Sequence, residues 1–390
     1  MPAGGARLIV ILGGLAAFGP LAIDMYLPAF PAMVRDLATE PAAVQRTLAA
    51  FFAGMGLGQL AYGPLADRLG RRPPLFLGLS LFTLASAGAA LAQEVGWLSW
   101  LRLAQGLGGC AGMVVARAVV RDLTEGPATI RMMSQLMLVM GIAPILAPSL
   151  GSALLAVAGW RAIFWALAAY GAALILAVAL ALPESLPPAR RRRDGPLAVL
   201  GVYAALLADR RFLGNALAGG LATAGMFAYI AASPFVFMDL HGLSPRGYGL
   251  LFGLNALGIM AVAQLNARLA RRVPAERALA AVQAAMAGAG ALLLAAVLAG
   301  IAGFALTAGL VLVFVAGIGA ASPLAAGLAM APHGRAAGSA SALLGALQFG
   351  LGALAGWLTG ALQDGTALPM ALVMALCAAA GLLARVALAR

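Results

Sequence analysis

One acidic residue lies deep inside an apolar segment. The stretch AIDMYLPAF (22–30) places Asp24 sixteen residues after Leu8, where the segment begins. At 1.5 Å per helical residue, this is ~24 Å along a helix. Arg102 lies five residues, or ~8 Å, into a segment that we expect to enter from the opposite surface. In a hydrocarbon core ~30 Å thick, both side chains fall at similar depth in the outer half.

Ionisable side chains inside a membrane face the protein interior and usually have partners. We therefore predict that Asp24 and Arg102 form a pair that faces a central cavity. A buried carboxylate that loses its counter-charge binds a proton more readily, so this pair is a candidate for proton coupling. The alternative is a static pair that orients two helices.

Polar and aromatic side chains near this depth are candidates for contacting a substrate. Apolar walls with a few polar groups suit moderately hydrophobic small molecules. Each of these side chains has packing or interhelical hydrogen bonding as an alternative role. The candidates are Tyr26, Gln59, Gln105, Phe227, Tyr229, Asn255 and Gln348.

The composition indicates which kind of structural element must position these residues. The chain has 390 residues, of which 63% are hydrophobic and 10% charged, and apolar runs of about 20 residues recur along it. This predicts an all-α membrane protein with twelve transmembrane helices. The expected spans are 8–30, 44–66, 73–92, 97–119, 131–157, 162–182, 212–238, 246–270, 275–298, 301–326, 335–362 and 367–389.

The basic residues are all arginine and the chain has no lysine. This excludes a Walker A loop and a Schiff-base lysine, so the chain does not supply its own ATP hydrolysis. We expect no cofactor and no metal site. The net charge of +12 reflects arginines in short loops rather than binding to nucleic acid.

The arginines also predict the topology. With Arg7 inside, most basic residues fall in loops on the same side, so both termini are expected to be cytoplasmic. The longest connection divides the chain into a six-helix bundle at 1–183, a cytoplasmic linker at 184–211 and a second six-helix bundle at 212–390. LADRLGRR (65–72) and LNARLARR (265–272) share their arginine spacing, so the halves are expected to be pseudo-symmetric.

Several motifs resemble those of a known family. GPLADRLGRRPP (63–74) is similar to the loop 2–3 motif of the major facilitator superfamily. Together with PLAIDMYLPAFP (20–31), RLAQGLGG (102–109), VARAVVRDL (115–123) and APILAPSLG (143–151), it makes the chain resemble the Bcr/CflA group of bicyclomycin-resistance drug:proton antiporters.

This resemblance implies alternating access between two halves, and a gate at two places. The loop motif would act as a latch, and the prolines and glycine of APILAPSLG would shape the seam between the halves, a feature that accompanies export. The implied gating residues are Gly63, Asp67, Arg68, Gly70, Arg71, Arg72, Pro144, Pro148 and Gly151.

We therefore expect a multi-pass protein of the bacterial inner membrane that exports drugs or other small organic molecules in exchange for protons, works as a monomer and is not an enzyme. Its partners would be a small-molecule substrate, protons and the lipid bilayer. An exporter of a metabolite such as an amino acid or dipeptide is the alternative among transporters. A membrane-embedded enzyme or a channel is the alternative from another class.

Overall fold

The computed structural model describes residues 3–191, 196–270 and 272–389, and the described chain is helical, with no strand. Arg271 and the linker residues 192–195 lie outside the described residues. The α-helices are α1 (Ala3–Asp24), α2 (Phe30–Asp36), α3 (Pro41–Leu69), α4 (Arg72–Ala90), α5 (Val95–Leu123), α6 (Pro127–Ala181), α7 (Pro196–Ala208), α8 (Arg210–Pro234), α9 (Pro245–Leu269), α10 (Ala275–Leu298), α11 (Phe304–Met330), α12 (Ala337–Ala361) and α13 (Leu368–Leu388). Shorter helical turns are η1 (Leu27–Ala29), η2 (Pro188–Arg190), η3 (Phe235–Leu240) and η4 (Gly334–Ala336).

Eleven helical segments among the described residues are long and apolar enough to span a membrane. One of them, at Arg131–Ala181, has 51 residues, far more than the roughly 20 that one crossing needs. Its backbone leaves the helical conformation at Gly159, where φ is 77°. This residue divides α6 into two crossings, so the predicted total of twelve transmembrane helices is confirmed.

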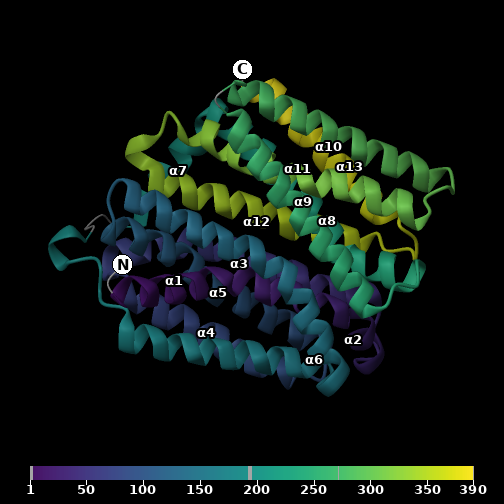
Figure 1. The fold of residues 1–390 in the computed structure, drawn as a ribbon, viewed down its shortest axis with the longest axis horizontal. Helices are drawn as coiled ribbons and strands as arrows, with labels where there is room; N and C mark the ends of the chain where they lie inside the picture. Colours follow the sequence, from purple (N-terminus) through teal and green to yellow (C-terminus); the bar gives the residue numbers. More distant parts are fainter. Residues whose placement is uncertain (1–2, 192–195, 271, 390) are drawn as a thin grey trace.

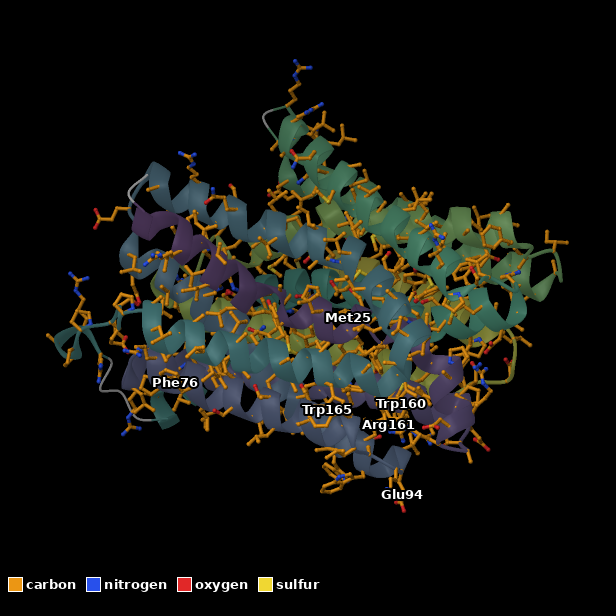
Figure 2. All side chains as sticks on the ribbon, turned by 60° about the horizontal axis from the view of Figure 1, so that its bottom comes forward. Met25, Phe76, Glu94, Trp160, Arg161 and Trp165 are labelled. Carbon is orange, nitrogen blue, oxygen red and sulfur yellow. The ribbon has the colours of Figure 1, made fainter. Side chains whose placement is uncertain are left out.

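The turn at Gly159 is held by the two residues that follow it. Trp160 Nε1 donates a 3.0 Å hydrogen bond to Asp36, and Arg161 forms an ion pair with the same carboxylate. Arg161 also donates to the Ala92 carbonyl at 3.1 Å. Figure 2 shows Trp160 and Arg161 together near one end of the bundle, away from the central Met25.

The helices form two groups that meet along a seam (Figure 1). Helices α1 and α3–α6 pack against one another, and α8–α13 form the second group. Across the seam, α3 packs along α12 and α6 packs along α9. The all-α fold with two six-helix halves is therefore confirmed, whereas the boundaries at 183/184 and 211/212 stay predictions.

The predicted linker contains a helix that the sequence analysis did not anticipate. Helix α7 is an apolar segment that packs against α8 and α12. Its Tyr203 hydroxyl donates a 3.3 Å hydrogen bond to the Leu60 carbonyl of α3. Helix α7 thus contacts both halves, and we call the end of the bundle where it lies the linker end. The opposite end, where α2 and η3 meet, is the far end.

Glycines allow the helices of the first half to approach closely. A Cβ atom at Gly106 of α5 would overlap the Phe51 carbonyl oxygen of α3. A Cβ atom at Gly54 of α3 would likewise overlap the Leu103 carbonyl oxygen of α5. This reciprocal contact brings the two backbones together, as small residues do in membrane helix pairs.

We expect Gly106→Ala to destabilise the folded protein by about 1–3 kcal/mol or more, because a backbone carbonyl cannot move aside as a side chain can. The measurement is the melting temperature and the monodisperse yield of the detergent-purified protein. Gly309→Ala is the matched control, since a Cβ atom there meets nothing within 4 Å. Equal losses in both variants would contradict the close-contact explanation.

Candidate functional site

Asp24 is the last residue of α1, and a proline explains why the helix ends there. The ring of Pro28 removes one backbone donor and clashes with a helical carbonyl four residues earlier, which is that of Asp24. The chain then makes the short turn η1 before α2 begins. Asp24 is only 4% exposed, so its carboxyl is enclosed where the helix is interrupted.

Arg102 of α5 is fully buried within the first half. Its Nη2 donates a 2.9 Å hydrogen bond to the Ala22 carbonyl of α1, and its Nη1 donates to Gln105. The guanidinium lies 4.3 Å from the ring centroids of both Tyr26 and Phe51. A cation over aromatic faces is stabilised by their quadrupoles, more strongly where water is excluded.

Tyr26 and Gln105, two of the predicted substrate-contacting residues, therefore support Arg102. Gln105 Nε2 donates a 2.7 Å hydrogen bond to the Ser86 hydroxyl of α4. The Tyr26 hydroxyl lies 3.3 Å from that of Thr47 on α3. Both side chains are buried and hydrogen-bonded, and together they connect the turn after α1 with α3, α4 and α5 around the guanidinium.

The predicted pairing of Asp24 with Arg102 is not formed in this structure. Both residues are described, and no salt bridge or hydrogen bond joins them. The reason is that the guanidinium is enclosed by rings and directed to Ala22 and Gln105. Across the seam, Tyr229 of α8 and Tyr248 of α9 lie within electrostatic range of the Asp24 carboxyl.

Polar side chains of the second half form a cluster that includes Tyr229 and Tyr248. Asn255 Nδ2 donates a 2.8 Å hydrogen bond to the Tyr229 hydroxyl, and the Ser233 and Tyr248 hydroxyls lie 2.8 Å apart. The buried Asn255 Oδ1 has no donor among the described residues. This cluster thus contains an unused hydrogen-bond acceptor among the described residues.

Sequence reasoning identified Tyr229 and Asn255 but missed Ser233 and Tyr248. The signal was present as helical spacing. Ser233 follows Tyr229 by four residues, and Tyr248 precedes Asn255 by seven, so each missed residue shares a helix face with an identified one.

The other three predicted substrate-contacting residues lie apart from this cluster. Phe227 stacks on Phe52 at 4.1 Å, a contact across the seam. Gln348 Nε2 donates a 2.8 Å hydrogen bond to Thr223 within the second half. Gln59 lines a cavity at the linker end. The structure therefore does not bring all seven predicted residues into one site.

Arg71, one of the predicted gating residues, is the centre of an ionic network at the linker end. Its Nη1 lies 2.6 Å from Asp67, and its Nε and Nη2 donate to Asp122 of α5 at 2.7 and 3.1 Å. Asp122 also accepts a 2.9 Å hydrogen bond from Ser185. These residues belong to the first half, except Ser185 at the start of the predicted linker, so the described contacts of Arg71 do not join the two halves.

Glu184, after the end of α6, completes this network and was not predicted. Its carboxylate accepts the backbone N–H groups of Arg71 at 2.8 Å, Arg72 at 3.1 Å and Leu186 at 3.0 Å. Gly70 has φ of +100°, and a side chain there would crowd this carboxylate. An acid among the first amides of α4 is favoured by the helix dipole. The sequence did contain a signal for this role. Asp67 and Asp122 lie near the ends of α3 and α5, and Glu184 likewise follows the end of α6.

The remaining residues of the loop motif differ in their contacts. Arg72 Nη2 donates a 3.1 Å hydrogen bond to the Ala179 carbonyl at the end of α6. Arg68 is exposed. Gly63 lines the linker-end cavity, where its closest neighbour for an added Cβ is Ala342 of α12 at 3.9 Å.

The proline-containing motif of α6 lies on the seam. Ser152 Oγ donates hydrogen bonds to the carbonyls of Pro148, in its own helix, and Pro245, at the start of α9. A Cβ atom at Gly151 would overlap the Met25 carbonyl oxygen. Gly151 therefore lets α6 touch the chain directly after Asp24. Pro144 lies one turn before Pro148 in the same helix.

Twelve membrane crossings in two groups, with an enclosed carboxyl at the seam, define a secondary-transporter architecture. The Major Facilitator Superfamily model matches residues 12–357. The chain belongs to the major facilitator superfamily, and it is a multi-pass membrane protein.

Curated relatives agree with this assignment. The uncharacterized MFS-type transporter YdgK of Bacillus subtilis is 38% identical over 389 residues, covering 98% of this chain and 96% of the relative. The bicyclomycin resistance protein homolog of Haemophilus influenzae is 30% identical over 376 residues, covering 96% and 94%. The multidrug resistance protein MdtL of Escherichia coli is 30% identical over 251 residues, covering 64% and 63%. The expected resemblance to the bicyclomycin-resistance group is thus confirmed.

Solved structures with the same fold include transporters of different substrates. A D-xylose-proton symporter aligns with a TM-score of 0.73 at 16% identity, covering 96% of each chain. The human organic anion transporter MFSD10 (TETRAN) aligns with a TM-score of 0.70 at 19% identity, covering 99% of each chain. At these identities the similarity concerns the fold alone.

We expect Arg102→Lys to lower stability by on the order of 2–3 kcal/mol, although it keeps the charge. Lysine lacks the planar group that stacks on Tyr26 and Phe51 while donating to two acceptors. The measurement is the melting temperature of the purified protein, with the exposed Arg246→Lys as control. A wild-type melting temperature would show that charge alone suffices at this position.

The Glu184 carboxylate makes the stability of the linker end depend on pH. Partial burial disfavours its charged form, but the backbone N–H groups of Arg71, Leu186 and Arg72 and the charge of Arg191 lower its pKa below the ordinary value. A lowered folded pKa stabilises the protein above the unfolded value of about 4.3. This stabilisation is lost as the pH falls through the folded pKa.

We therefore expect Glu184→Gln to melt at a lower temperature than wild type at pH 7, with the difference shrinking towards pH 3. Thermal melts of both proteins across this range test the expectation, and Glu125→Gln, at an exposed carboxyl, is the control. A difference that does not depend on pH would mean that the charge of Glu184 is irrelevant.

Proposed function

We propose that this chain is a proton-coupled exporter of drugs or other small organic molecules, working by alternating access. The observation that carries this proposal is the state of Asp24. Asp24 is 4% exposed, its carboxyl has no hydrogen bond or ion pair among the described residues, and it lies within electrostatic range of Tyr229 and Tyr248 of the opposite half. Membership of the superfamily and the names of the drug-resistance relatives support the proposal.

The chemistry follows from the position of Asp24 between the halves. When ionised, the carboxylate attracts hydrogen-bond donors or positive charge into the seam. When protonated, it is neutral, and the seam can close around it without a buried charge. A bound proton would therefore favour the neutral Asp24 carboxyl, and a bound substrate the ionised one. Proton and substrate would then not bind at the same time, as an exchange of one for the other requires.

Arg102 acts in this proposal as a positioning residue. Its bonds to Ala22 and its stacking on Tyr26 fix the chain on both sides of Asp24. The proposed coupling needs the surroundings of Asp24 to change as the halves move, while Arg102 keeps its bonds to Ala22 and Gln105. A transient contact between the two charged groups in another conformation remains part of the proposal.

The proposed orientation places the linker end in the cytoplasm. This end holds the network of Arg71 and the arginine-rich linker, as the positive-inside rule requires. Both termini would then be cytoplasmic, in a bacterial inner membrane, and a monomer contains both halves that the cycle needs.

A single proton supplies enough energy for useful export. Moving one elementary charge through ~150 mV releases about 3.5 kcal/mol. Since 1.4 kcal/mol corresponds to a factor of ten, this supports a gradient of a few hundred-fold for a neutral solute.

We expect Asp24→Asn to fold but to lose export driven by a pH gradient, because an amide cannot exchange a proton. The measurement is a drug-susceptibility panel in an efflux-deficient bacterial host, together with drug-induced proton movement in vesicles. Resistance should fall to the level of the empty vector. Glu94→Gln is the matched carboxyl-to-amide control at an exposed site.

Retained gradient-driven export by Asp24→Asn would overturn the proton-coupling role. Wild-type protein that changes no susceptibility, yet exchanges amino acids or dipeptides for protons, would instead support a metabolite exporter. Saturation of transport with substrate concentration separates either exporter from a channel.

A further inference from the structure

A cavity of about 160 Å³ lies at the linker end, between the two halves. One water needs roughly 10–15 Å³ measured in this way, so the cavity has room for a group of several atoms. Its walls come from α3 and α5 of the first half, α12 of the second half and α7 of the linker. Figure 1 shows α7 beside the start of α12 at this end of the bundle.

The cavity wall carries more unpaired positive charge than unpaired negative charge among the described residues. Arg71, Arg117 and Arg121 line it, with Asp67 as its acidic member. Asp67 is already paired with Arg71 at 2.6 Å, and Arg71 is bound further by Asp122. Within the described residues, neither Arg117 nor Arg121 has a carboxylate within ion-pair distance.

Arg117 and Arg121 lie one turn apart on α5, and both face the cavity. Like charges at this spacing repel each other in a helix. Arg117 Nε donates a 3.1 Å hydrogen bond to the Met113 carbonyl, and its two terminal nitrogens have no partner among the described residues. An anion between the two guanidinium groups would relieve this repulsion and use the free donors.

Neutral donors on other walls complement the arginines. Ser339 and Ser341 lie in the first turns of α12, where the backbone amides and the helix dipole favour negative charge. Gln59 of α3, which carries a side-chain amide, lines the same cavity. Oxyanions are recognised by this combination of guanidinium, hydroxyl and amide donors.

We propose that the linker-end cavity is a binding site for an oxyanion, a carboxylate or phosphate group, held by Arg117 and Arg121 of the first half and by Ser339 and Ser341 of the second. Occupation of this site bridges the halves through charge-assisted hydrogen bonds at the end opposite to Asp24. The bound group belongs either to a small soluble anion or to the headgroup of an anionic lipid. This site is independent of the proton exchange proposed for Asp24.

The test measures binding to the purified full-length protein in a neutral detergent. Inorganic phosphate replaces chloride at constant ionic strength, and the melting temperature is recorded as a function of its concentration. A parallel arm places the protein in nanodiscs of phosphatidylcholine with and without phosphatidylglycerol. We expect phosphate or phosphatidylglycerol to raise the melting temperature of the wild-type protein. A variant that loses one arginine of the cavity, and with it one charge-assisted contact, should bind the same ligand with about tenfold weaker apparent affinity.

The variants are Arg117→Gln, Arg121→Gln and the exposed far-end control Arg246→Gln. Arg121 is exposed and makes no described hydrogen bond, so its variant keeps the test valid if Arg117→Gln does not fold. Stabilisation by phosphate that is weakened in the cavity variants alone supports a soluble anion. The same pattern with phosphatidylglycerol alone supports a lipid headgroup. The proposal is overturned if neither ligand stabilises the protein, or if all three variants respond as wild type does.

Discussion

A cation buried in an apolar helix bundle needs hydrogen-bond acceptors from the protein itself, because water is excluded. The first half of this transporter is arranged to supply such acceptors to Arg102. Arg102 is fully buried and has no carboxylate partner within the described residues. Its stabilisation comes from a carbonyl, an amide and the faces of Tyr26 and Phe51, which α1, α3 and α5 contribute. These helices cannot separate without exposing the charge to hydrocarbon, so the half behaves as one unit.

The carboxyl of Asp24 has the opposite character. Pro28 ends α1 at this residue, and the close approach at Gly151 fixes the chain just after it. Tyr229 and Tyr248 of the other half lie within electrostatic range of this carboxyl, whereas the arginine of its own half is bound to Ala22 and Gln105. Arg102, whose charge is balanced within one half, stabilises that half. The environment of Asp24, at the seam, depends instead on the relative position of the two halves.

The two ends of the seam differ in what holds them. At the far end, a hydrogen bond from the Ser152 hydroxyl of α6 to the Pro245 carbonyl of α9 joins the halves. At the linker end, the ionic network of Arg71 joins the first half to the start of the linker but not to the second half, and a cavity separates it from α12. The halves are therefore joined by a direct hydrogen bond at the far end, whereas at the linker end a cavity lies between them.

The sequence by itself determined the membrane class, the twelve crossings and the burial of Asp24 and Arg102, because hydropathy and helix length act locally along the chain. Only the tertiary structure decided their partners. Counting residues along the two helices placed Asp24 and Arg102 at similar depth in the membrane. This count carries no information about the direction in which a side chain points around its helix. The roles of Tyr248 and Glu184 depended on contacts between distant segments. Partner choice is fixed by the packing of several helices at once, and a one-dimensional pattern does not contain it.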